Sequence, residues 1–412
     1  MKEITLGFAG SGFIAEFQLK ALCQLRSGEL KGILRRSGAE RLASMAMEAG
    51  IGSPKIYDTV EEMAKHVDAI ALYTPNDTRL ELLEEIVRSK RAGAPVKGVI
   101  CDKPLGRNVK EARRMVQLAD EGGLLTSYFE NQIHMKTLTT QRRQLEPLAR
   151  TLGPLSLCRS AEEHAGPHKP WFWDPRRQGG GVLSDMGCHS IAVGWYALTP
   201  AGKEPTCLIP QSVSCDVALL KWGQPAWRNK LLKNQGVDYA TTPAEDFATG
   251  IVTFKNPETG QKVKAQFTDS WMYDKQGLRL FMDGMGPGYS FEINSLISPL
   301  AVFIADEAGN VADGEAALEK ATASRGLLSV QANEPDLYGY VDENRDALEA
   351  FSRGRNGLLP FSYGLEITRL VMAAYLAAEE KRTIDLTKPE IRQQLETYVP
   401  LIQQGRGAEQ LL

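Results

Sequence analysis

Asp185 and His189 are the side chains of this 412-residue chain whose types and spacing most directly suggest catalysis. They follow three consecutive glycines, Gly179–Gly181, and an apolar stripe with helical spacing begins at Cys188. Residues four apart share one face of a helix. A carboxylate beside an imidazole can orient the ring and keep it basic near neutral pH, as taking a proton from an alcohol requires. On its own, however, such a pair is more often an ordinary surface pair.

Two short polar segments each follow a strand-like apolar run, at 68–73 and at 96–101. The carboxyl ends of parallel strands are where open α/β sheets bind ligands, so we expect both segments to contact a cofactor. By itself, a lysine before a proline at a strand end is more often a solvated loop residue. The segments consist of Thr74, Pro75 and Asn76, and of Asp102, Lys103 and Pro104.

A glycine-rich turn lies where the first strand-like run ends and a helical pattern begins. In that context it fits the G-x-G-x-x-A pattern of dinucleotide sites. Gly10 permits the tight turn, Gly12 lets the backbone approach a pyrophosphate, and Ala15 lets the helix lie close to the sheet. Phe13 and Ile14 open that helix, whose N-terminus attracts the anion. The turn therefore predicts an NAD(P) site.

Arginines stand where an acidic residue would bind the ribose of NAD, about 20 positions beyond the turn. The chain has Arg35 and Arg36 there, followed by Ser37. Two guanidinium groups suit a 2′-phosphate, so we favour NADP over NAD. The alternative is that one arginine stacks on adenine and the other is solvated, which would give no discrimination.

The pattern of apolar residues predicts two kinds of sheet. In the first third of the chain, strand-like runs alternate with segments of three- and four-residue apolar spacing, which predicts a parallel, doubly wound α/β sheet. Beyond about residue 150, longer alternating stretches predict an antiparallel sheet. The first runs lie at 3–9, 31–34, 68–73, 96–101 and 124–128. The later stretches lie at 212–222, 246–254, 262–271, 278–283 and 289–293.

Two stretches of the second part lack such a pattern. Residues 223–245 read as an insertion or long loop, and residues 309–336 are similarly irregular. Near the end, apolar residues at helical spacing from Tyr363 to Glu380 predict a packed amphipathic helix.

Composition narrows the classes of function. The 48 Lys+Arg nearly balance 51 Asp+Glu, so the chain has no basic excess with which to bind nucleic acid. No apolar stretch approaches the ~20 residues of a membrane span, and no signal peptide precedes the first strand-like run. The six cysteines show no CxxC spacing. We therefore expect free thiols, a cytoplasmic location and no membrane partner.

Taken together, these motifs resemble the Gfo/Idh/MocA oxidoreductases, relatives of glucose–fructose oxidoreductase and inositol 2-dehydrogenase. The resemblance spans nearly the whole chain. The family usually reads Glu-Lys-Pro where this chain has Asp102, Lys103 and Pro104, so the acid is one methylene shorter. The resemblance is carried by the glycine turn, Thr74-Pro75-Asn76, Lys103-Pro104, the triple glycine with Asp185 and His189, and the segment 364–370.

The resemblance implies an N-terminal Rossmann domain and a C-terminal α+β domain with a large, open, mainly antiparallel sheet. It also implies an NAD(P)-dependent dehydrogenase or reductase acting on a secondary alcohol or ketone of a sugar, sugar derivative or cyclitol. Lys103 would hydrogen-bond the reacting oxygen, His189 would be the general acid and base, and Asp185 would orient the substrate and the imidazole.

We place the domain boundaries from the same resemblance and pattern. Residues 1–130 are the expected dinucleotide-binding domain and 131–362 the substrate and oligomerisation domain. Residues 363–412 are the expected C-terminal helix and tail, packed back on the domains.

The stretch 162–174 holds two of the five histidines and two of the six tryptophans. Aromatic rings alternating with polar groups suit the apolar faces and hydroxyls of a pyranose, so we expect it to form a substrate wall. Two alternatives are an aromatic plug at the domain interface and a metal site. We disfavour the metal site because prolines interrupt the spacing of the histidines and because hydride transfer needs no metal. The expected contacts are His164, His168, Trp171, Trp173 and Asp185 for substrate, and Asn131 for cofactor.

Two other functions stay open at this point. One is redox-neutral glycoside hydrolysis with a tightly bound cofactor, in which a ring hydroxyl is oxidised, the aglycone eliminated and the hydride returned. The other is a non-catalytic, ligand-sensing relative, which the retention of Lys103, Asp185 and His189 disfavours. A homo-oligomer is expected because the open sheet would otherwise expose apolar residues. These residues are Val252, Phe254, Phe267 and Trp271.

Overall fold

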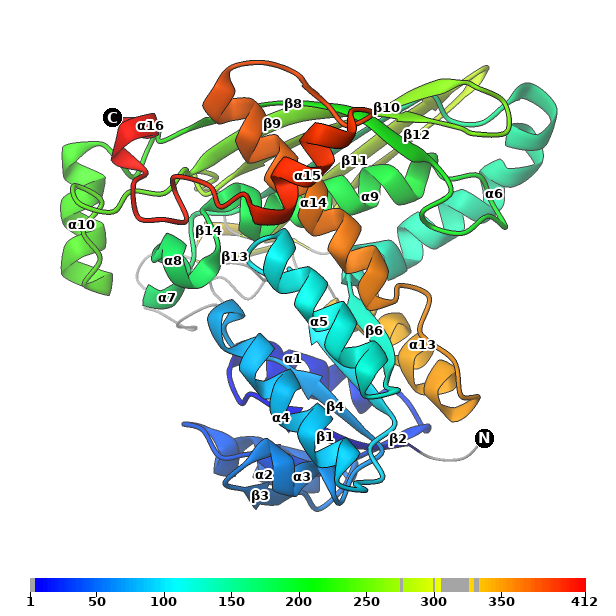
Figure 1. Ribbon diagram of the computed structural model, residues 1–412, viewed down its shortest axis with the longest axis vertical. Coiled ribbons are helices and arrows are strands. Elements are labelled where there is room, and N and C mark those ends of the chain that lie inside the picture. Colours follow the sequence, from blue (N-terminus) through cyan, green and yellow to red (C-terminus); the bar gives the residue numbers. More distant parts are fainter. Residues whose placement is uncertain (1–3, 275–276, 299–300, 305–325, 330–332) are drawn as a thin grey trace. The chain divides into compact units, whose positions relative to one another are not determined.

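The computed structural model describes residues 4–274, 277–298, 301–304, 326–329 and 333–412 (Figure 1). The chain divides into two compact units, each built around one large sheet. The first unit comprises Met1–Gly106, Lys110–Lys136 and Pro335–Glu366, and the second comprises Arg107–Val109, Thr137–Glu334 and Ile367–Leu412. One sheet is wholly parallel and the other mostly antiparallel, so the predicted fold class is confirmed.

The first unit contains a six-stranded parallel sheet in the order β3-β2-β1-β4-β5-β6. This order places the chain reversal between β1 and β4, the point at which such sheets bind dinucleotides. The strands are β1 (Ile4–Ala9), β2 (Gly28–Leu34), β3 (Lys55–Tyr57), β4 (Ala69–Leu72), β5 (Gly98–Asp102) and β6 (Leu125–Phe129). Five match predicted runs, whereas β3 was missed because three residues are too few to show a period.

Helices connect these strands in the alternation that the sequence predicts. Thr59 caps the helix that begins at Val60, accepting a hydrogen bond from the Glu62 amide at 3.2 Å. The helices are α1 (Phe13–Leu22), α2 (Ala39–Glu48), α3 (Val60–Ala64), α4 (Arg79–Arg91) and α5 (Val109–Glu121), with short 3₁₀ turns η1 (Asn76–Thr78) and η2 (Asn131–His134).

A helix from late in the chain completes the first unit. α13 (Tyr340–Ser352) packs against α1, and its Phe351 approaches Gly98 so closely that a Cβ there would lie 2.6 Å from the ring. Gln18 Nε2 donates to Glu343 Oε1 at 2.9 Å, while Asn344 Nδ2 donates to Gln18 Oε1 at 2.5 Å. The parallel sheet is thus covered in part by residues far along the sequence.

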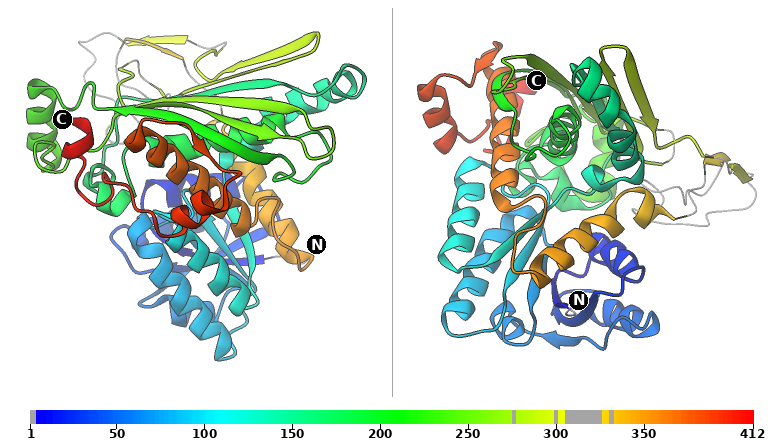
Figure 2. Two further views of the ribbon diagram at one scale, coloured as in Figure 1. Left: turned by 45° about the horizontal axis from the view of Figure 1, so that its top comes forward. Right: turned by 90° about the vertical axis from the view of Figure 1, so that its right-hand side faces the viewer.

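The second unit contains a seven-stranded sheet in the order β12-β11-β7-β10-β9-β8-β15. All neighbours are antiparallel except β10 and β7, and Figure 2 shows the long strands running side by side. β7 and β15 were not predicted. The strands are β7 (Leu157–Glu163), β8 (Ile209–Ala218), β9 (Phe247–Lys255), β10 (Lys262–Ser270), β11 (Arg279–Gly286), β12 (Tyr289–Asn294) and β15 (Ile384–Asp385), besides a separate pair, β13 (Ala301–Ile304) and β14 (Gly326–Ser329).

The remaining helices include two that bear on the predictions. α14 (Phe361–Glu380) confirms the closing helix, and α10 (Pro225–Gln235) occupies the segment expected to be a loop. Most of the irregular stretch 309–336 lies outside the described residues. The others are α6 (Lys136–Leu152), α7 (Pro170–Trp173), α8 (Pro175–Gln178), α9 (Cys188–Leu198), α12 (Glu334–Leu337), α15 (Pro389–Thr397) and α16 (Ala408–Leu411).

The apolar residues assigned to an exposed sheet face are buried instead. Val252 and Phe254 on β9, Phe267 on β10 and Trp271 just beyond it are at most 1% exposed. α9 packs against β7 and β10, and its Trp195 stacks on Phe254 with ring centres 5.1 Å apart. The prediction that these side chains are exposed is wrong, because α9 packs over this sheet, with Trp195 on Phe254, while Trp271 packs against Trp173. The homo-oligomer itself stays a prediction.

The described residues contain neither a disulfide nor a helix with the length and apolarity that crossing a bilayer requires. All six cysteines are free thiols, as expected from their spacing.

Replacing Phe254 by alanine should lower the free energy of unfolding by about 3–5 kcal/mol, since the substitution leaves a cavity beside Trp195. Urea denaturation followed by circular dichroism measures the loss. Ile251→Ala is the matched control, because Ile251 lies on the same strand and is 39% exposed; its loss should stay within about 0.5 kcal/mol. Equal losses in both variants would contradict the assignment of the two sheet faces.

Candidate active site

The glycine turn after β1 has the shape of an anion cradle. Gly10 has a φ of 133°, and a Cβ there would lie 2.3 Å from the Tyr73 carbonyl oxygen, so only glycine fits. Gly12 caps α1, and no described atom lies within 4 Å of where its Cβ would be. Ser11 Oγ donates to the Ser37 carbonyl at 2.9 Å, which ties the turn to the loop after β2. Open space at a helix N-terminus suits a pyrophosphate.

One buried arginine joins the two strand-end segments predicted to contact the cofactor. Arg79 is 4% exposed, and its Nε donates to the Thr74 carbonyl at 3.0 Å. Its Nη1 donates to the carbonyls of Asp102 at 2.6 Å and Pro104 at 2.5 Å. Arg79 was not predicted from the sequence, where it shows only as an arginine that opens the helix after Thr74-Pro75-Asn76. The guanidinium fixes the backbone on both sides of Lys103, whose peptide bond to Pro104 is cis.

A buried hydroxyl in the first of these segments has no hydrogen-bond partner in the described part of the chain. Thr74 Oγ1 has no hydrogen-bond partner among the described residues, although Thr74 is only 7% exposed. Unsatisfied buried polar atoms are few in native structures, and a bound water, ion or ligand is one way in which their bonding is completed. Together with the open cradle at Gly12, this orphaned hydroxyl fits a bound nicotinamide dinucleotide. Asn76 is likewise buried at the start of η1.

A buried carboxyl group, that of Glu130, lies near Lys103 within the first unit. Burial raises the pKa of Glu130 well above its usual value, while the nearby Lys103 ammonium acts against that rise. Burial similarly raises the pKa of Glu343. Asn131 Nδ2 donates to the Tyr338 carbonyl at 2.7 Å, which orients this amide; its cofactor contact stays a prediction.

The two arginines after β2 differ in their partners. Arg35 is exposed, and its Nε donates to Asp58 Oδ1 at 2.5 Å, a bond that raises the pKa of Arg35. Arg36 Nη1 donates to the Arg35 carbonyl at 2.8 Å and forms no ion pair within the described ranges. The two side chains therefore differ in that Arg35 is held in an ion pair with Asp58 and Arg36 is not.

The triple glycine of the second unit packs closely against two buried residues, Tyr375 and Glu245. A Cβ on Gly180 would lie 1.9 Å from Tyr375 Oη, and one on Gly181 would lie 2.2 Å from the Glu245 carbonyl oxygen. Glu245 Oε1 accepts hydrogen bonds from the amides of Gly181 and Leu183, each at 3.0 Å, and from Tyr375 Oη at 2.6 Å. Glu245 and Tyr375 therefore hold the loop that leads to Asp185, and neither was singled out from the sequence.

Asp185 and His189 are both buried at the start of α9. Asp185 is 5% exposed and lies in η3 (Leu183–Gly187), a π-helical turn, whereas His189 is 4% exposed and is the second residue of α9. The sequence predicts a single α-helix that carries both Asp185 and His189, so the π-helical turn at Asp185 differs from that prediction. Such turns are rare and frequently occur at functional sites.

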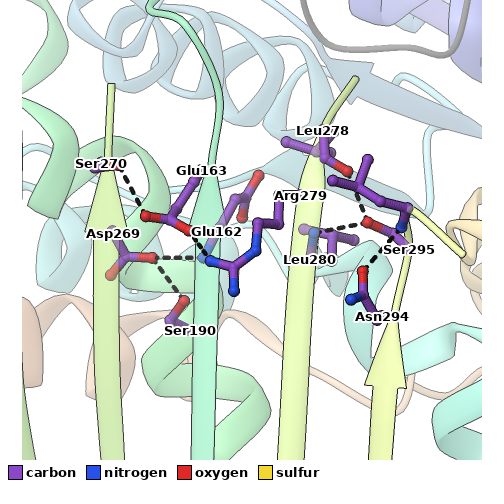
Figure 3. A network of polar contacts seen from close by, with 11 residues as sticks. Glu162, Glu163, Ser190, Asp269, Ser270, Leu278, Arg279, Leu280, Asn294 and Ser295 are labelled. Carbon is purple, nitrogen blue, oxygen red and sulfur yellow. Dashed lines mark hydrogen bonds and ion pairs between the residues drawn. The ribbon is translucent and has the colours of Figure 1, made fainter. Parts of the chain in front are cut away.

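The sheet anchors the residue that follows His189. Ser190 Oγ donates to Asp269 Oδ1 at 2.7 Å, and the Glu162 amide donates to the same oxygen at 3.2 Å (Figure 3). Ser160 Oγ in turn donates to the Ser190 carbonyl at 2.7 Å. Because Asp269 is fully buried, its pKa is raised well above the usual range. These contacts fix the first turn of α9 against β7 and β10.

The predicted substrate wall divides into buried and accessible side chains. Trp173 is 1% exposed and packs edge-on against Trp222 at 4.8 Å and Trp271 at 5.1 Å. His164 is also buried, and its Nδ1 accepts a hydrogen bond from the Gly166 amide at 2.9 Å. His168 is partly exposed, and Trp171 stacks on Phe172. Their contacts with substrate stay predictions.

No three His, Cys, Asp or Glu side chains gather as a metal site would require in the part of the chain that the structure describes.

Two family profiles match the chain. One, described as an oxidoreductase family with an NAD-binding Rossmann fold, matches residues 4–129. The other, described as a GFO/IDH/MocA C-terminal domain, matches residues 149–285.

Curated relatives match over part of their length. The 1,5-anhydro-D-fructose reductase of Ensifer adhaerens is 30% identical over 186 residues, which cover 44% of this chain and 53% of the relative. The rhizopine catabolism protein MocA of Rhizobium meliloti is 26% identical over 212 residues, covering 50% and 60%. The D-glucoside 3-dehydrogenase of Escherichia coli K12 is 25% identical over 218 residues, covering 52% and 56%. The chain thus spans between about half and three-fifths of these relatives.

Solved structures share the fold at low identity. GenD2 from gentamicin A biosynthesis, in complex with NAD, has a TM-score of 0.73 at 18% identity and covers 94% of this chain and 97% of its own. A putative myo-inositol dehydrogenase from Sinorhizobium meliloti 1021 has a TM-score of 0.67 at 19% identity, covering 93% and 99%. At these identities the likeness shows the fold alone.

Glu245 predicts a specific dependence of stability on pH. Burial raises its pKa to about 7, so the folded protein holds this proton more tightly than the unfolded chain does. The free energy of unfolding should therefore fall by up to about 3 kcal/mol as the pH rises from about 4.5 to about 7. Glu245→Gln cannot titrate, so that part of the decline should vanish in denaturant titrations across this range.

The matched control is Glu292→Gln, which changes an exposed carboxyl of the same unit and should keep the wild-type decline. If Glu245→Gln and wild type instead decline in parallel between pH 4.5 and 7, burial does not raise the pKa of Glu245 as described.

Proposed function

The chain belongs to the Gfo/Idh/MocA family of oxidoreductases, and from that premise we propose that it transfers hydride between a nicotinamide cofactor and a carbohydrate-like secondary alcohol or ketone. The substrate class comprises sugars, sugar derivatives and cyclitols. The observation that carries this proposal is the buried pair of Asp185 and His189 on an anchored helix start, in a chain that also has a dinucleotide cradle. Two relatives are named as a sugar reductase and a glucoside dehydrogenase, which supports the substrate class.

We assign proton transfer to His189. When bound, the nicotinamide ring accepts or returns the hydride. A carbinol carbon releases hydride readily only as its hydroxyl proton leaves, so a neutral imidazole must take that proton during oxidation and return it during reduction. Asp185, in the preceding turn, is assigned to orienting the imidazole and the substrate. The fixed helix start restricts both side chains, which favours a constant geometry for the transfer.

We assign stabilisation of the developing alkoxide to Lys103. A cationic donor aimed at an oxygen that gains negative charge lowers the barrier because its interaction strengthens in the transition state. The neighbouring Glu130 lies close enough to interact with the ammonium. The backbone clamp made by Arg79 holds the segment from which Lys103 projects.

His189→Ala should lower turnover by about 10²–10⁴-fold, the usual contribution of general acid–base catalysis. Initial rates with a sugar panel, followed by nicotinamide absorbance, measure this loss. Cofactor affinity should remain close to the wild-type value, because the glycine turn and the Thr74 hydroxyl assigned to the cofactor are unchanged. His66→Ala, which removes a half-exposed histidine that pairs with Glu62, is the control and should turn over normally. Normal turnover in His189→Ala would exclude it from the chemistry.

We also propose that the cofactor is NADP rather than NAD. Arg36 forms no ion pair within the described ranges, although its charge acts to lower the pKa of Glu85, whereas Arg35 is paired with Asp58 and Glu40, so the Arg36 guanidinium is the one we assign to a 2′-phosphate. NADPH should then bind wild type at least about tenfold more tightly than NADH, and Arg36→Ala should remove most of that difference. Fluorescence titration gives both dissociation constants. Equal affinities in wild type would end the NADP proposal without touching the assignment of His189.

A further inference from the structure

A pocket of about 230 Å³ lies within the second unit, and neither Asp185 nor His189 lines it. The segment 223–245, which the sequence marks only as an insertion, supplies part of its lining through α10. The inner wall of the pocket is buried and mostly apolar, whereas its rim carries exposed polar side chains. The inner wall includes Trp173, Trp222 and Leu231, and the rim includes Lys230, Asn234 and Asp274.

Tryptophan rings form the inner wall and are fixed before any ligand arrives. Trp222 packs edge-on against Trp173, with ring centres 4.8 Å apart, and against Trp227 at 5.4 Å. Trp173 Nε1 donates to the Pro167 carbonyl at 2.9 Å, and Trp222 Nε1 donates to the Trp271 carbonyl at 2.8 Å. Because an indole has only this one donor, the two buried rings offer aromatic carbon and no hydrogen bond to a ligand hydroxyl. The wall therefore suits a flat apolar ring better than a hydroxylated one.

A buried ammonium group borders this apolar wall. The Lys221 side chain is only 9% exposed, and it pairs with Asp274, whose side chain is 66% exposed. A buried charge is costly unless a counter-charge accompanies it. Since Asp274 keeps most of its surface in water, this carboxylate can turn outwards at little cost when another carboxylate takes its place beside Lys221.

The backbone that carries Lys221 is held rigidly. Asp246 is fully buried, and its carboxylate accepts hydrogen bonds from the amides of Leu220 at 2.7 Å, Lys221 at 2.8 Å and Trp222 at 2.7 Å. Three successive amides thus converge on one carboxylate and order the turn that they belong to. A charged group on an ordered backbone loses less entropy when it pairs with a ligand.

A second ammonium group lies beside the same tryptophan as the first. Lys221 Nζ is 4.2 Å and Lys230 Nζ is 4.8 Å from the centre of the Trp227 ring. Among the lysine, arginine, aspartate and glutamate side chains that line the pocket, these two ammonium groups face the single carboxylate of Asp274. The lining therefore carries a net positive charge that one monoanion would balance.

Wall and charge together select one class of ligand. A neutral ring would fill the apolar wall but would gain nothing from the two ammonium groups. A cation would be repelled, and the lysines of the chain already lie at the Trp227 ring, where a ligand cation would bind. A dianion would exceed the single positive charge that the lining offers. The volume lies below that of pockets for drug-sized ligands, as a single ring requires.

We propose that this pocket binds a small carboxylate that carries one flat apolar ring, with the ring on the tryptophan wall and the carboxylate at Lys221 and Lys230. Such a ligand differs in chemistry from the sugar or cyclitol of the proposed function, so the pocket is a second, separate binding site. The inference does not depend on hydride transfer, and its test needs no turnover.

Calorimetric titration of the full-length protein with benzoate tests the site, with benzamide and acetate as matched probes. Benzamide has the ring without the charge, and acetate has the charge without the ring. Each should bind wild type at least about fivefold more weakly than benzoate, because only benzoate uses both the indole wall and the ammonium groups. The proposal is overturned if either probe binds as tightly as benzoate.

Substitutions locate the bound benzoate. Lys230→Gln should weaken benzoate about threefold, as expected for an exposed ion pair, and should leave benzamide unchanged. Trp227→Ala should weaken both. Lys233→Gln, an exposed change on α10 outside the lining, should bind benzoate as wild type does, and so should His189→Ala.

The outcomes of these substitutions separate the pocket from the candidate active site. Full benzoate affinity in both Lys230→Gln and Trp227→Ala would overturn the proposal, as would a loss confined to His189→Ala. Because Lys230 is exposed, Lys230→Gln decides alone if Trp227→Ala folds poorly.

Discussion

The acceptance of three hydrogen bonds by one buried carboxylate is the interaction on which the second unit's candidate site depends. Glu245 is fully buried, and its Oε1 receives the Gly181 and Leu183 amides and the Tyr375 hydroxyl. A π-helical turn that follows a glycine loop leaves backbone amides without helical partners, and these need an acceptor. Glu245 thereby fixes the glycine loop that leads into the turn carrying Asp185 and, after it, His189.

In the first unit the side chain is a cation and the main-chain groups that it binds are carbonyls. Strand-end loops expose carbonyl groups, and Arg79 donates to three of them, at Thr74, Asp102 and Pro104. In both units a buried ionisable side chain organises main-chain groups of the complementary polarity, and the side chains assigned to chemistry project from that backbone. The buried charges cost desolvation, which the hydrogen bonds offset only because every donor or acceptor is already in place. Arg79 and Glu245 position other residues and need not contact a substrate themselves.

Burial, and not exposure, explains the apolar residues of the large sheet. Phe254 and Phe267 alternate with polar neighbours along their strands, a pattern that fits a sheet with one covered face and one solvated face. The sequence pattern shows that one face is apolar, but it cannot show that α9 supplies the cover. The same reasoning applies to α10. Its sequence is weakly amphipathic and resembles a polar loop, and only the structure shows that Trp227 and Leu231 line a pocket.

Local information in the sequence determined the alternation of strands and helices, the glycine turn at Gly10 and Gly12, and the residue types at the strand ends. These features could be predicted because each arises from neighbours within a few positions, through side-chain period or backbone φ. Only the tertiary structure decided that α13 completes the first unit, that Arg79 and Glu245 hold the candidate site, and that three tryptophans enclose a cavity. Those contacts join residues far apart in the chain, such as Gln18 and Glu343, which are separated by 325 positions. No local pattern encodes such a partner, because the energy of a buried polar group depends on what the rest of the fold places beside it.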